Sequence, residues 1–383
     1  MCGEWIGQRT CVPWHDSTLP TMRTLNICTA LVIFAVLSGC AQPPRQVTAD
    51  DFKVLRTYGF DTTVPEPQAT WNPETYQLLA RSAGGFSILD EGTGLQQSFA
   101  SPANEAKHET AYPVWISRLQ FAFGPKDNVI TTVDERVVPT SEGISVVTLL
   151  ESITGRNAPL PRKTLTKFGY RPRVWGRNLV TTSQNRIFVV NPFGEISEFG
   201  PGFMPEPQRM GVGITWQEHP VMEVDHWTGS DTRRGNLWIR WRTGVTTSLA
   251  NAVEARWTAE GGVLCTVMRA EPLPGQPWWS GGTDIYYIVN AKAKPVLVAV
   301  DARSGSPHPK ERVCAAVGRS GALILCGFDG NFRNQVKEKG DNPEWSYDGR
   351  RLVAEEPGVD GQSDKRWLQV YVFKAVNAAN TAK

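Results

Sequence analysis

The densest group of side chains with metal-binding chemistry lies between residues 218 and 226. Glu218, His219, Glu223, Asp225 and His226 bring two imidazoles and three carboxyl groups within nine residues, and both types are ligands for divalent cations. If the segment between the two histidines is a strand, alternate side chains point to opposite faces. His219 and His226 are separated by an odd number of residues and then diverge. We therefore expect polar loop residues here rather than a metal site.

Other motifs with chemical meaning are incomplete or missing from the sequence. Asp329–Asn334 begins like a calcium loop, but Arg333 stands at a ligand position and Asn334 stands where the sharp turn needs glycine. The sequence contains no Gly-x-Ser-x-Gly elbow and no Gly-Lys-Ser/Thr phosphate loop. We expect a protein with no catalytic residues, no metal and no cofactor, in which Asp329–Asn334 is an inter-strand turn.

Two aromatic and basic segments are candidates for binding a partner. Trp278 and Trp279 lie in a Pro- and Gly-rich loop, where paired rings form an exposed platform for a protein or a sugar ring. The alternative is that both rings cover the strands below. Arg240 and Arg242 share one face of a predicted strand over Trp238–Arg242. That face is structural in one interpretation and meets an anionic partner in the other.

Cys40 ends a segment with the build of a secretory signal. Arg23 precedes a mostly apolar run from Leu25 to Val36, and small residues then close on Cys40. The run is shorter than the roughly 20 apolar residues of a membrane span, so cleavage is predicted rather than permanent insertion. Leu37–Cys40 resembles the lipobox of bacterial lipoproteins. The resemblance implies that Cys40 becomes the new N-terminus and that its thiol carries a lipid.

The segments around this signal have separate predicted roles. Residues 1–21 lack the features of a signal, so we expect a wrongly assigned upstream start, and the alternative is a real N-terminal extension. Residues 22–39 form the predicted signal peptide, and 40–51, with Pro43 and Pro44, a tether for the lipid-anchored chain. Ala41 after the lipid-bearing cysteine, in place of Asp, resembles lipoproteins destined for the outer membrane of diderm bacteria.

Composition narrows the classes of function. The net charge of +2 is nearly balanced, which argues against a dedicated nucleic-acid surface or a polybasic membrane patch. Four of the seven cysteines follow the signal, too few for a disulfide framework. Cys314 and Cys326 lie in apolar runs joined by Gly318–Gly321, and a hairpin centred on Ser320 places them opposite each other. One disulfide and two buried thiols both fit this placement.

Beyond residue 51 the chain consists of brief runs rich in Val, Ile, Leu, Tyr and Trp, separated by Gly, Pro, Asn and Asp, with no long amphipathic helical pattern. This pattern is typical of an all-β fold. The predicted strands include Gln77–Ala80, Phe86–Leu89, Val129–Val133, Ser145–Leu150, Arg186–Val190, Leu237–Trp241, Val263–Met268, Asp284–Val289, Val296–Val300 and Leu368–Phe373. So many short strands require a sandwich, a barrel or a propeller.

Internal repetition favours the propeller. A Trp precedes an apolar run at Trp71, Trp115, Trp175, Trp257 and Trp345, with Trp216 as a looser member. Successive separations are 44, 60, 41, 41 and 88 residues, and the last is twice 44. This period is about one blade of four strands. The sequence therefore predicts a β-propeller of six or seven four-stranded blades over 52–375, followed by a disordered tail, 376–383. The region around Val317 is predicted to supply a blade without a Trp.

A family resemblance is carried by Asn342–Ala354, which reads Asn-Pro-Glu-Trp-Ser-Tyr-Asp-Gly-Arg-Arg-Leu-Val-Ala. It is similar to the Pro-x-Trp-Ser-Pro-Asp-Gly-x-x-Leu-Ala unit of TolB-type, WD-like β-propellers, and departs from it at Tyr347, where the family prefers Pro. Trp345 is expected to pack between neighbouring blades, and Asp348–Gly349 to form the tight turn before the next strand. The family's soluble periplasmic member carries an α/β domain for which Ala41–Gln68 is too short. Its partner contacts therefore do not transfer.

A second, weaker resemblance is to BamB-type lipoproteins of outer-membrane assembly, in architecture and through Val298–Gly305. Together these features predict a non-catalytic, lipid-anchored scaffold of the bacterial cell envelope, at the outer membrane, that binds an envelope protein and no nucleic acid. The alternative is a glycan- or peptidoglycan-binding protein, or a glycan-active enzyme, that uses the propeller mouth. A component of a surface or secretion machine is not separable from the scaffold by sequence.

Overall fold

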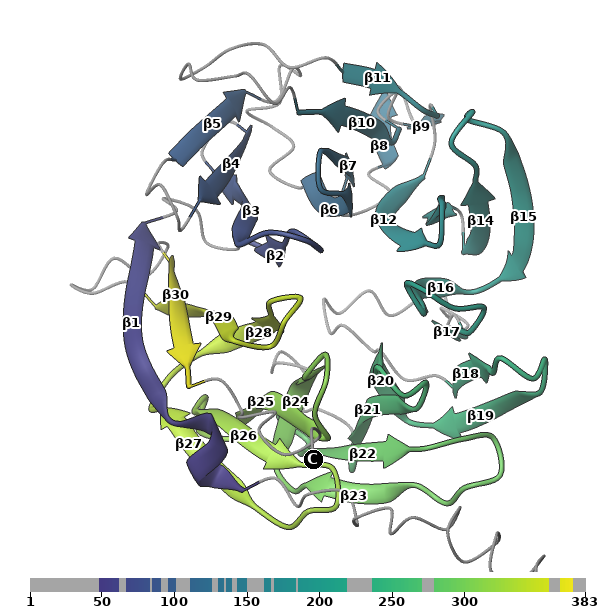
Figure 1. Cartoon of the computed structure of the whole chain (residues 1–383). Helices are drawn as coiled ribbons and strands as arrows, with labels where there is room; N and C mark the ends of the chain where they lie inside the picture. The colour runs from purple at the N-terminus through teal and green to yellow at the C-terminus, as the bar shows by residue number, and fades with distance from the viewer. Residues whose placement is uncertain are drawn as a thin grey trace, which may run out of the picture. The chain divides into compact units, whose positions relative to one another are not determined.

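The computed structural model shows a β-propeller of seven four-stranded antiparallel sheets, plus one two-stranded hairpin (Figure 1). The predicted fold class is confirmed, and the blade number is seven. The structure describes residues 48–61, 67–82, 85–90, 96–100, 111–125, 130–133, 136–139, 143–149, 162–166, 169–183, 185–218, 236–270, 279–357 and 366–374.

The first four blades follow one another along the chain. Blade 1 contains β2 (Thr70–Trp71), β3 (Gln77–Ser82), β4 (Gly85–Asp90) and β5 (Gln96–Ala100). Blade 2 contains β6 (Ala111–Ser117), β7 (Gln120–Pro125), β10 (Ser145–Thr148) and β11 (Arg162–Thr164), with the hairpin β8 (Ile130–Val133) and β9 (Arg136–Pro139) between β7 and β10. Blade 3 contains β12 (Tyr170–Trp175), β13 (Asn178–Ser183), β14 (Arg186–Val190) and β15 (Ile196–Pro201). Blade 4 contains β16 (Phe203–Pro207), β17 (Ile214–Gln217), β18 (Asn236–Arg240) and β19 (Thr246–Ala250).

The last three blades complete the ring. Blade 5 contains β20 (Ala252–Trp257), β21 (Val263–Met268), β22 (Thr283–Ile288) and β23 (Val296–Ala299). Blade 6 contains β24 (Ala302–Pro307), β25 (Val313–Gly318), β26 (Leu323–Gly327) and β27 (Arg333–Lys337). Blade 7 contains β28 (Asp341–Trp345), β29 (Arg351–Pro357), β30 (Arg366–Phe373) and β1 (Val54–Asp61). The 3₁₀ turn η1 (Ala49–Phe52) precedes β1 and is the one helical element among the described residues.

The ring is closed by pairing the first described strand with the last one. β1 pairs antiparallel with β30 and becomes the outer strand of blade 7. Phe52, just before β1, is buried, and its ring lies 6.0 Å from that of Trp345 and 6.1 Å from that of Phe373. Separating the chain ends would therefore break a ladder and expose a core aromatic group.

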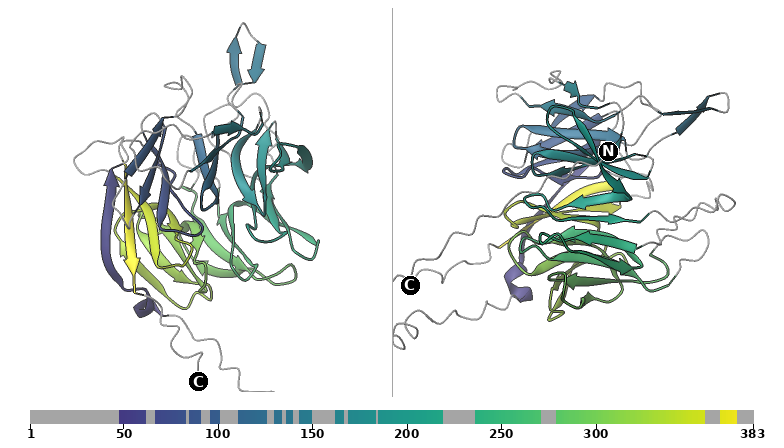
Figure 2. Two further views of the ribbon diagram at one scale, coloured as in Figure 1. Left: turned by 45° about the horizontal axis from the view of Figure 1, so that its top comes forward. Right: turned by 90° about the vertical axis from the view of Figure 1, so that its right-hand side faces the viewer.

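Strand direction defines two faces of the propeller. Because strands alternate in direction, every inner strand begins on the same face, and the connections from second to third strands lie on that face too. We call it the pocket face. The opposite face, the terminus face, carries the start of β1 at Val54 and the end of β30 at Phe373. In Figure 2 the purple start of β1 and the β8–β9 hairpin lie at opposite ends of the molecule.

Tryptophan side chains connect neighbouring blades. Four indole N–H groups donate to carbonyl oxygens on the inner strand of the preceding blade: Trp71 to Glu344 (3.0 Å), Trp115 to Thr70 (3.1 Å), Trp257 to Glu206 (2.9 Å) and Trp345 to Ser306 (3.1 Å). In blade 3 the Trp175 indole instead donates to Gly211 O (3.0 Å) in blade 4. The expected packing of Trp345 between blades is thus confirmed. A buried carbonyl left without a donor is costly, so these bonds also fix the blades in register.

Blades 4 and 6 lack this Trp. Their inner strands end at Pro207 and Pro307, which hold the position that Trp holds in the other blades. The interval before Trp345 contains blade 6, and the predicted strand around Val317 is its second strand, β25. Trp216 is not a blade marker: it lies in the second strand, β17, with its ring edge-to-face on Phe199 at 5.3 Å. The equal spacing around Trp216 arose because an insertion in blade 4 lengthens that blade.

The motif at Asn342–Ala354 forms the inner strand, turn and second strand of blade 7. Ser346 Oγ donates to Asp348 Oδ1 (2.8 Å), and Gly349 has φ +76°. Tyr347, the departure from the family pattern, stacks on Tyr76 of blade 1 with ring centroids 5.5 Å apart, and the Tyr76 hydroxyl donates to Asp348 Oδ2 (2.7 Å). The substituted position therefore adds a contact across the seam that closes the ring.

His308 connects blade 6 to the same turn. Its Nδ1 accepts from the backbone N–H groups of Lys310 (3.2 Å) and Glu311 (2.9 Å), so Nε2 carries the proton and donates to Gly349 O (3.1 Å). A Cβ on Gly349 would lie 2.1 Å from His308 Nε2, so no other residue fits there. Burial lowers the pKa of His308 to about 4.

We expect Trp345→Phe to lower the free energy of unfolding by about 1 to 3 kcal/mol, because Ser306 O loses its donor inside the seam. Urea unfolding followed by circular dichroism measures this. Trp216→Phe is the matched control, because the Trp216 indole makes no hydrogen bond within the described part of the chain. Equal losses in the two variants would contradict the role of the seam bond.

Acid should weaken the protein through His308. Its pKa rises from about 4 when folded to 6.5 when unfolded, so the unfolded chain takes up the proton as pH falls from 6.5 to 4, and up to about 3 kcal/mol of stability is lost. His308→Gln keeps one acceptor and one donor but does not titrate. As pH falls from 6.5 to 4, the unfolding free energy of the wild type should therefore decrease relative to that of His308→Gln. A difference independent of pH would refute this.

Candidate functional site

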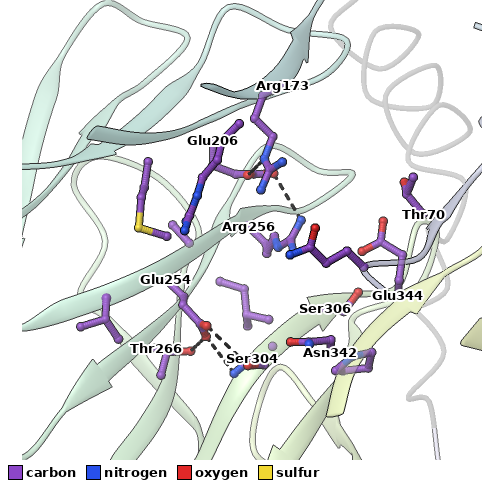
Figure 3. Close-up of a pocket in the computed structure, with 18 of the residues that line it drawn as sticks. Thr70, Arg173, Glu206, Glu254, Arg256, Thr266, Ser304, Ser306, Asn342 and Glu344 are labelled. Atoms are coloured by element: carbon purple, nitrogen blue, oxygen red, sulfur yellow. Dashed lines mark hydrogen bonds and ion pairs between the residues drawn. The ribbon is translucent and has the colours of Figure 1, made fainter. Parts of the chain in front are cut away.

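A central pocket of about 570 Å³ opens among the inner strands. Residues from all seven blades line it, mostly from the inner strands. Gln217, Trp279, Glu355 and Arg366 line it from the pocket-face ends of second and third strands and the connections between them, which places its mouth on the pocket face. Six arginines and five carboxylates face it: Arg171, Arg173, Arg209, Arg256, Arg303, Arg366, Glu206, Glu254, Asp341, Glu344 and Glu355. Figure 3 shows how side chains from several blades converge on it. Carboxylates from several blades therefore converge in the pocket together with arginines.

The pocket wall contains residues whose backbone is in the left-handed conformation. Five of its residues have positive φ although none is glycine: Gln68 (47°), Arg171 (49°), Met204 (48°), Ser304 (54°) and Asn342 (44°). In blades 3, 4, 6 and 7 a register shift, a β-bulge, interrupts the pairing of the inner strand at the same place. Bulges re-aim side chains, and left-handed backbone at non-glycine residues costs energy. Repeating this cost around one pocket points to a functional wall.

A basic half of the pocket surrounds Tyr112. The Arg173 guanidinium lies 4.7 Å from the centre of the Tyr112 ring, and that of Arg171 lies 5.6 Å from it. Burial alone would raise the pKa of Tyr112, but these two arginines outweigh it and lower the pKa. Glu206 bridges Arg173 (3.0 Å) and Arg256 (3.4 Å) (Figure 3). Positive charge is therefore in excess here.

The other half holds a network from blades 6 and 7. Asp341 accepts from Arg303 (2.7 Å) and Arg366 (3.4 Å), and Arg366 also contacts Glu355 Oε2 (3.2 Å). Burial raises the pKa of Glu355 to about 7 against the opposing charge of Arg366. Burial also acts on Asp341, but Arg303 outweighs it and holds that pKa below its usual range. Glu355 is therefore partly protonated near neutral pH while Asp341 stays ionised.

Two further carboxylates differ in their partners. Glu254 accepts from Thr266 Oγ1 (3.2 Å) and from the Ser304 backbone N–H (2.9 Å). Glu344 makes no side-chain ion pair or hydrogen bond with any described residue. Burial raises its pKa, and the positive charge of Arg256 opposes that rise. Glu344 is thus the pocket carboxyl left for a ligand.

Arg209 sets the far end of the pocket. It lies in the turn after the inner strand of blade 4, and its Nη2 donates to the carbonyls of Trp115 (3.0 Å) and Ile116 (3.1 Å) in blade 2. The side chain therefore reaches past blade 3. Its guanidinium group therefore places a positive charge at the end of the pocket opposite the mouth.

The predicted partner-binding residues are divided between the two faces. Trp279 lies on the pocket face, is 38 % exposed, lines the pocket and stacks with the Arg303 guanidinium at 4.3 Å. Trp278 lies outside the described residues. Arg240 and Arg242 are exposed at the end of β18 and in the turn after it, on the terminus face. The structure therefore does not bring the two groups together.

Cys314 and Cys326 are paired across β25 and β26, as the hairpin predicts. Both are buried free thiols in the structure. The ladder bond from Phe328 N to Arg312 O (2.9 Å) makes the two cysteines a hydrogen-bonded pair. In such pairs the Cβ atoms lie about 5.5 Å apart, beyond the roughly 4.5 Å of a disulfide. Burial raises the pKa of both thiols, which leaves them unreactive at neutral pH.

The remaining predicted features fall mainly on undescribed residues. Cys40, with residues 1–39, and His219–Asp231 lie outside the described residues, so lipidation stays a prediction. Asp329 is in the turn that leads from β26 to β27 and pairs with Arg312 (3.0 Å), in agreement with a plain inter-strand turn. Among the described residues no group of three or more His, Cys, Asp or Glu side chains is placed to hold a metal. No described helix combines the length and the apolar character needed to cross a bilayer.

Sequence reasoning missed the pocket arginines and the left-handed positions. Arg173, Arg256 and Arg303 are far apart in the sequence, in blades 3, 5 and 6. A signal existed in hindsight: in blades 1, 3, 5, 6 and 7 a polar residue lies three or four positions before the end of the inner strand. Reading it requires knowing where inner strands end, and in blades 4 and 6 Pro replaces the Trp that marks the end.

No protein-family model and no curated protein sequence matches this chain. Among solved structures, the tricorn protease is similar over 87% of this chain and 36% of its own, with TM-score 0.50 and 9% identity. The RRP9 WD40 repeats are similar over 86% of this chain and 99% of their own, with TM-score 0.48 and 11% identity. TolB from Acinetobacter baumannii is similar over 82% of this chain and 79% of its own, with TM-score 0.40 and 11% identity. At such identities the likeness to the tricorn protease shows a shared propeller fold and nothing further.

Glu355 should make the protein less stable as pH rises. Its pKa is about 7 folded and 4.5 unfolded, so between these values the folded state holds the extra proton, and up to about 3 kcal/mol is lost as pH increases. In Glu355→Gln this loss should disappear, while Arg366 keeps Asp341 as a partner. The measurement is the urea midpoint from pH 4.5 to 7.5 at constant ionic strength. A variant that follows the wild-type pH dependence would show that Glu355 is not the group responsible.

Proposed function

We propose that this chain is a non-catalytic, lipid-anchored scaffold of the bacterial cell envelope that binds a partner protein through its pocket face. One observation carries the proposal: five strained non-glycine residues from five blades surround one charged pocket. Strain of this kind persists where the surrounding structure holds it for a purpose. No group of pocket side chains described here has the nucleophile-and-base arrangement of a hydrolase, which favours binding over catalysis.

The connections between second and third strands support binding at this face. They are long in blades 2, 4, 5 and 7, whose second and third strands are separated by 126–144, 218–235, 269–282 and 358–365. All four start and end on the pocket face, around the mouth. Long loops on a rigid scaffold are where proteins place recognition.

The pocket favours an acidic segment of the partner. Arg173 and Arg256 share the single carboxylate of Glu206, and raised pKa values reduce the negative charge of Glu344 and Glu355. The pocket is therefore net positive at neutral pH. Arginines present several donors in a plane that matches a carboxylate.

The anchoring part of the proposal rests on the lipobox-like Leu37–Cys40, and the location at the outer membrane on Ala41. TolB-type membership rests on Asn342–Ala354, and a BamB-like role on architecture.

Cys40→Ser should abolish incorporation of labelled palmitate into the protein, while Cys28→Ser should leave it intact. Labelling that survives Cys40→Ser would remove the anchor from the proposal.

Trp279 favours a second candidate, a protein that binds acidic glycans. Its half-exposed ring lies in the pocket beside Arg303, and aromatic faces with arginines suit sugar rings that bear carboxylates. Glu344, with a raised pKa and no hydrogen bond to its carboxyl group from any described residue, would then contact the sugar. This candidate predicts that Trp279→Ala weakens binding of peptidoglycan fragments at least tenfold by calorimetry.

Site-specific photo-crosslinking tests the scaffold proposal in cells. A benzoylphenylalanine at Asn342, on the pocket wall, should form an adduct with an envelope protein, and one at Lys292, on the terminus face, should not form that adduct. Adding Arg256→Gln should reduce the Asn342 adduct at least tenfold, because a cation facing the acidic segment is lost. Arg177→Gln, an exposed arginine on the terminus face, is the matched control. An Asn342 adduct unaffected by Arg256→Gln would overturn the pocket as the binding site.

A further inference from the structure

The terminus face carries large apolar side chains at the tips of its turns. Met210 is 91 % exposed, Phe193 83 % and Val212 59 %, and Val245 and Val289 are also exposed. We call these five residues the turn patch. Turn tips are usually polar, because Gly, Pro, Asn, Asp and Ser favour turns. Exposed Phe and Met at several tips therefore need a surface to cover them.

Topology places the turn patch on one face of three consecutive blades. Phe193 lies between β14 and β15, Met210 and Val212 between β16 and β17, Val245 between β18 and β19, and Val289 between β22 and β23. Connections from first to second and from third to outer strands all lie on the terminus face. The patch thus belongs to blades 3, 4 and 5, across the ring from blade 7, where the described chain starts (Figure 1).

Basic side chains surround the turn patch. Exposed cations at the same turns and strand ends are Arg177, Arg240, Arg242, Lys292 and Lys294, and the exposed acids there are Glu195 and Glu260. The near-balanced net charge of the whole chain conceals this local excess. Apolar tips ringed by Lys and Arg are the composition of a surface that enters the headgroup region of an anionic bilayer.

The start of the described chain argues for a bilayer over a protein partner. Thr48 and η1 lead into β1 on the terminus face, and Thr48 is eight positions after Cys40. A chain of that length spans at most roughly 28 Å. An acylated Cys40 would therefore hold this face, and not the pocket face, close to the membrane.

We propose that the terminus face lies against a lipid bilayer and that the turn patch inserts into the headgroup region. The inference rests on the proposed acylation of Cys40. Attachment is then at two points, the acyl chain beside blade 7 and the turn patch on blades 3 to 5. Two points across the ring hold the propeller axis along the membrane normal. The pocket mouth and its long loops then face away from the bilayer.

Depth-dependent quenching tests this with the full-length acylated protein in vesicles of phosphatidylethanolamine and phosphatidylglycerol. An environment-sensitive fluorophore is attached at Met210→Cys or, as the matched control, at Val300→Cys, an exposed valine on the pocket face. The buried thiols Cys265, Cys314 and Cys326 do not compete for the label. Nitroxide-labelled lipid should quench the Met210 fluorophore at least twofold and leave the Val300 fluorophore unchanged.

A further variant separates the patch from the anchor. With the fluorophore at Val245→Cys, the double substitution Phe193→Ser, Met210→Ser should reduce quenching to the Val300 level although the protein still sediments with the vesicles. Sedimented protein whose Met210 fluorophore is not quenched overturns this inference and leaves the anchor intact. Protein that stays in the supernatant overturns the anchor and this inference with it. A Met210 fluorophore shielded only by added envelope protein would assign the patch to a protein partner and refute the lipid surface.

Discussion

The indole hydrogen bond across the blade seam is the constraint on which the rest of the structure depends. In four blades the N–H of a Trp at the end of the inner strand bonds to a carbonyl one residue before the same position in the preceding blade. One side chain thus fills the gap between two sheets and fixes their relative height. Because these bonds hold the inner strands at the same height along the propeller axis, the bulges a few residues earlier in each strand lie around that axis at one level. Together they form the wall of the pocket.

The charged groups of the pocket come from the inner strands of several blades and, in blade 7, also from β29 and β30. Its ion pairs join blades: Glu206 with Arg256 links blades 4 and 5, and Asp341 with Arg303 links blades 7 and 6. Such pairs contribute less to stability than to specificity, because desolvation of the charges offsets their attraction. Their value here is that they hold arginines in place while leaving donors for a ligand. The opposite pH dependences of His308 and Glu355 offset each other between pH 4.5 and 6.5.

The fold could be predicted from those local sequence patterns that recur in several blades. Short apolar runs, the turn at Asp348–Gly349 and the spacing of Trp all follow from strand and blade geometry, and they led to the correct fold class. The Trp marker failed where Pro207 and Pro307 replace it, and Trp216 misled because it lies in a second strand that is followed by an insertion. The connections between second and third strands differ in length from blade to blade, so they disturb a period that the core would otherwise keep.

The sequence by itself determined the secondary-structure class, the blade repeat, the pairing of Cys314 with Cys326 and the segment that resembles an export signal, because each depends on neighbours in the chain or on one hairpin. Only the tertiary structure decided which residues share a face. Trp279 and Arg240 look like equal candidates in the sequence, yet strand direction puts them on opposite faces. The pocket arginines and the turn patch come together for the same reason, since closing the ring makes neighbours of residues that no local pattern connects.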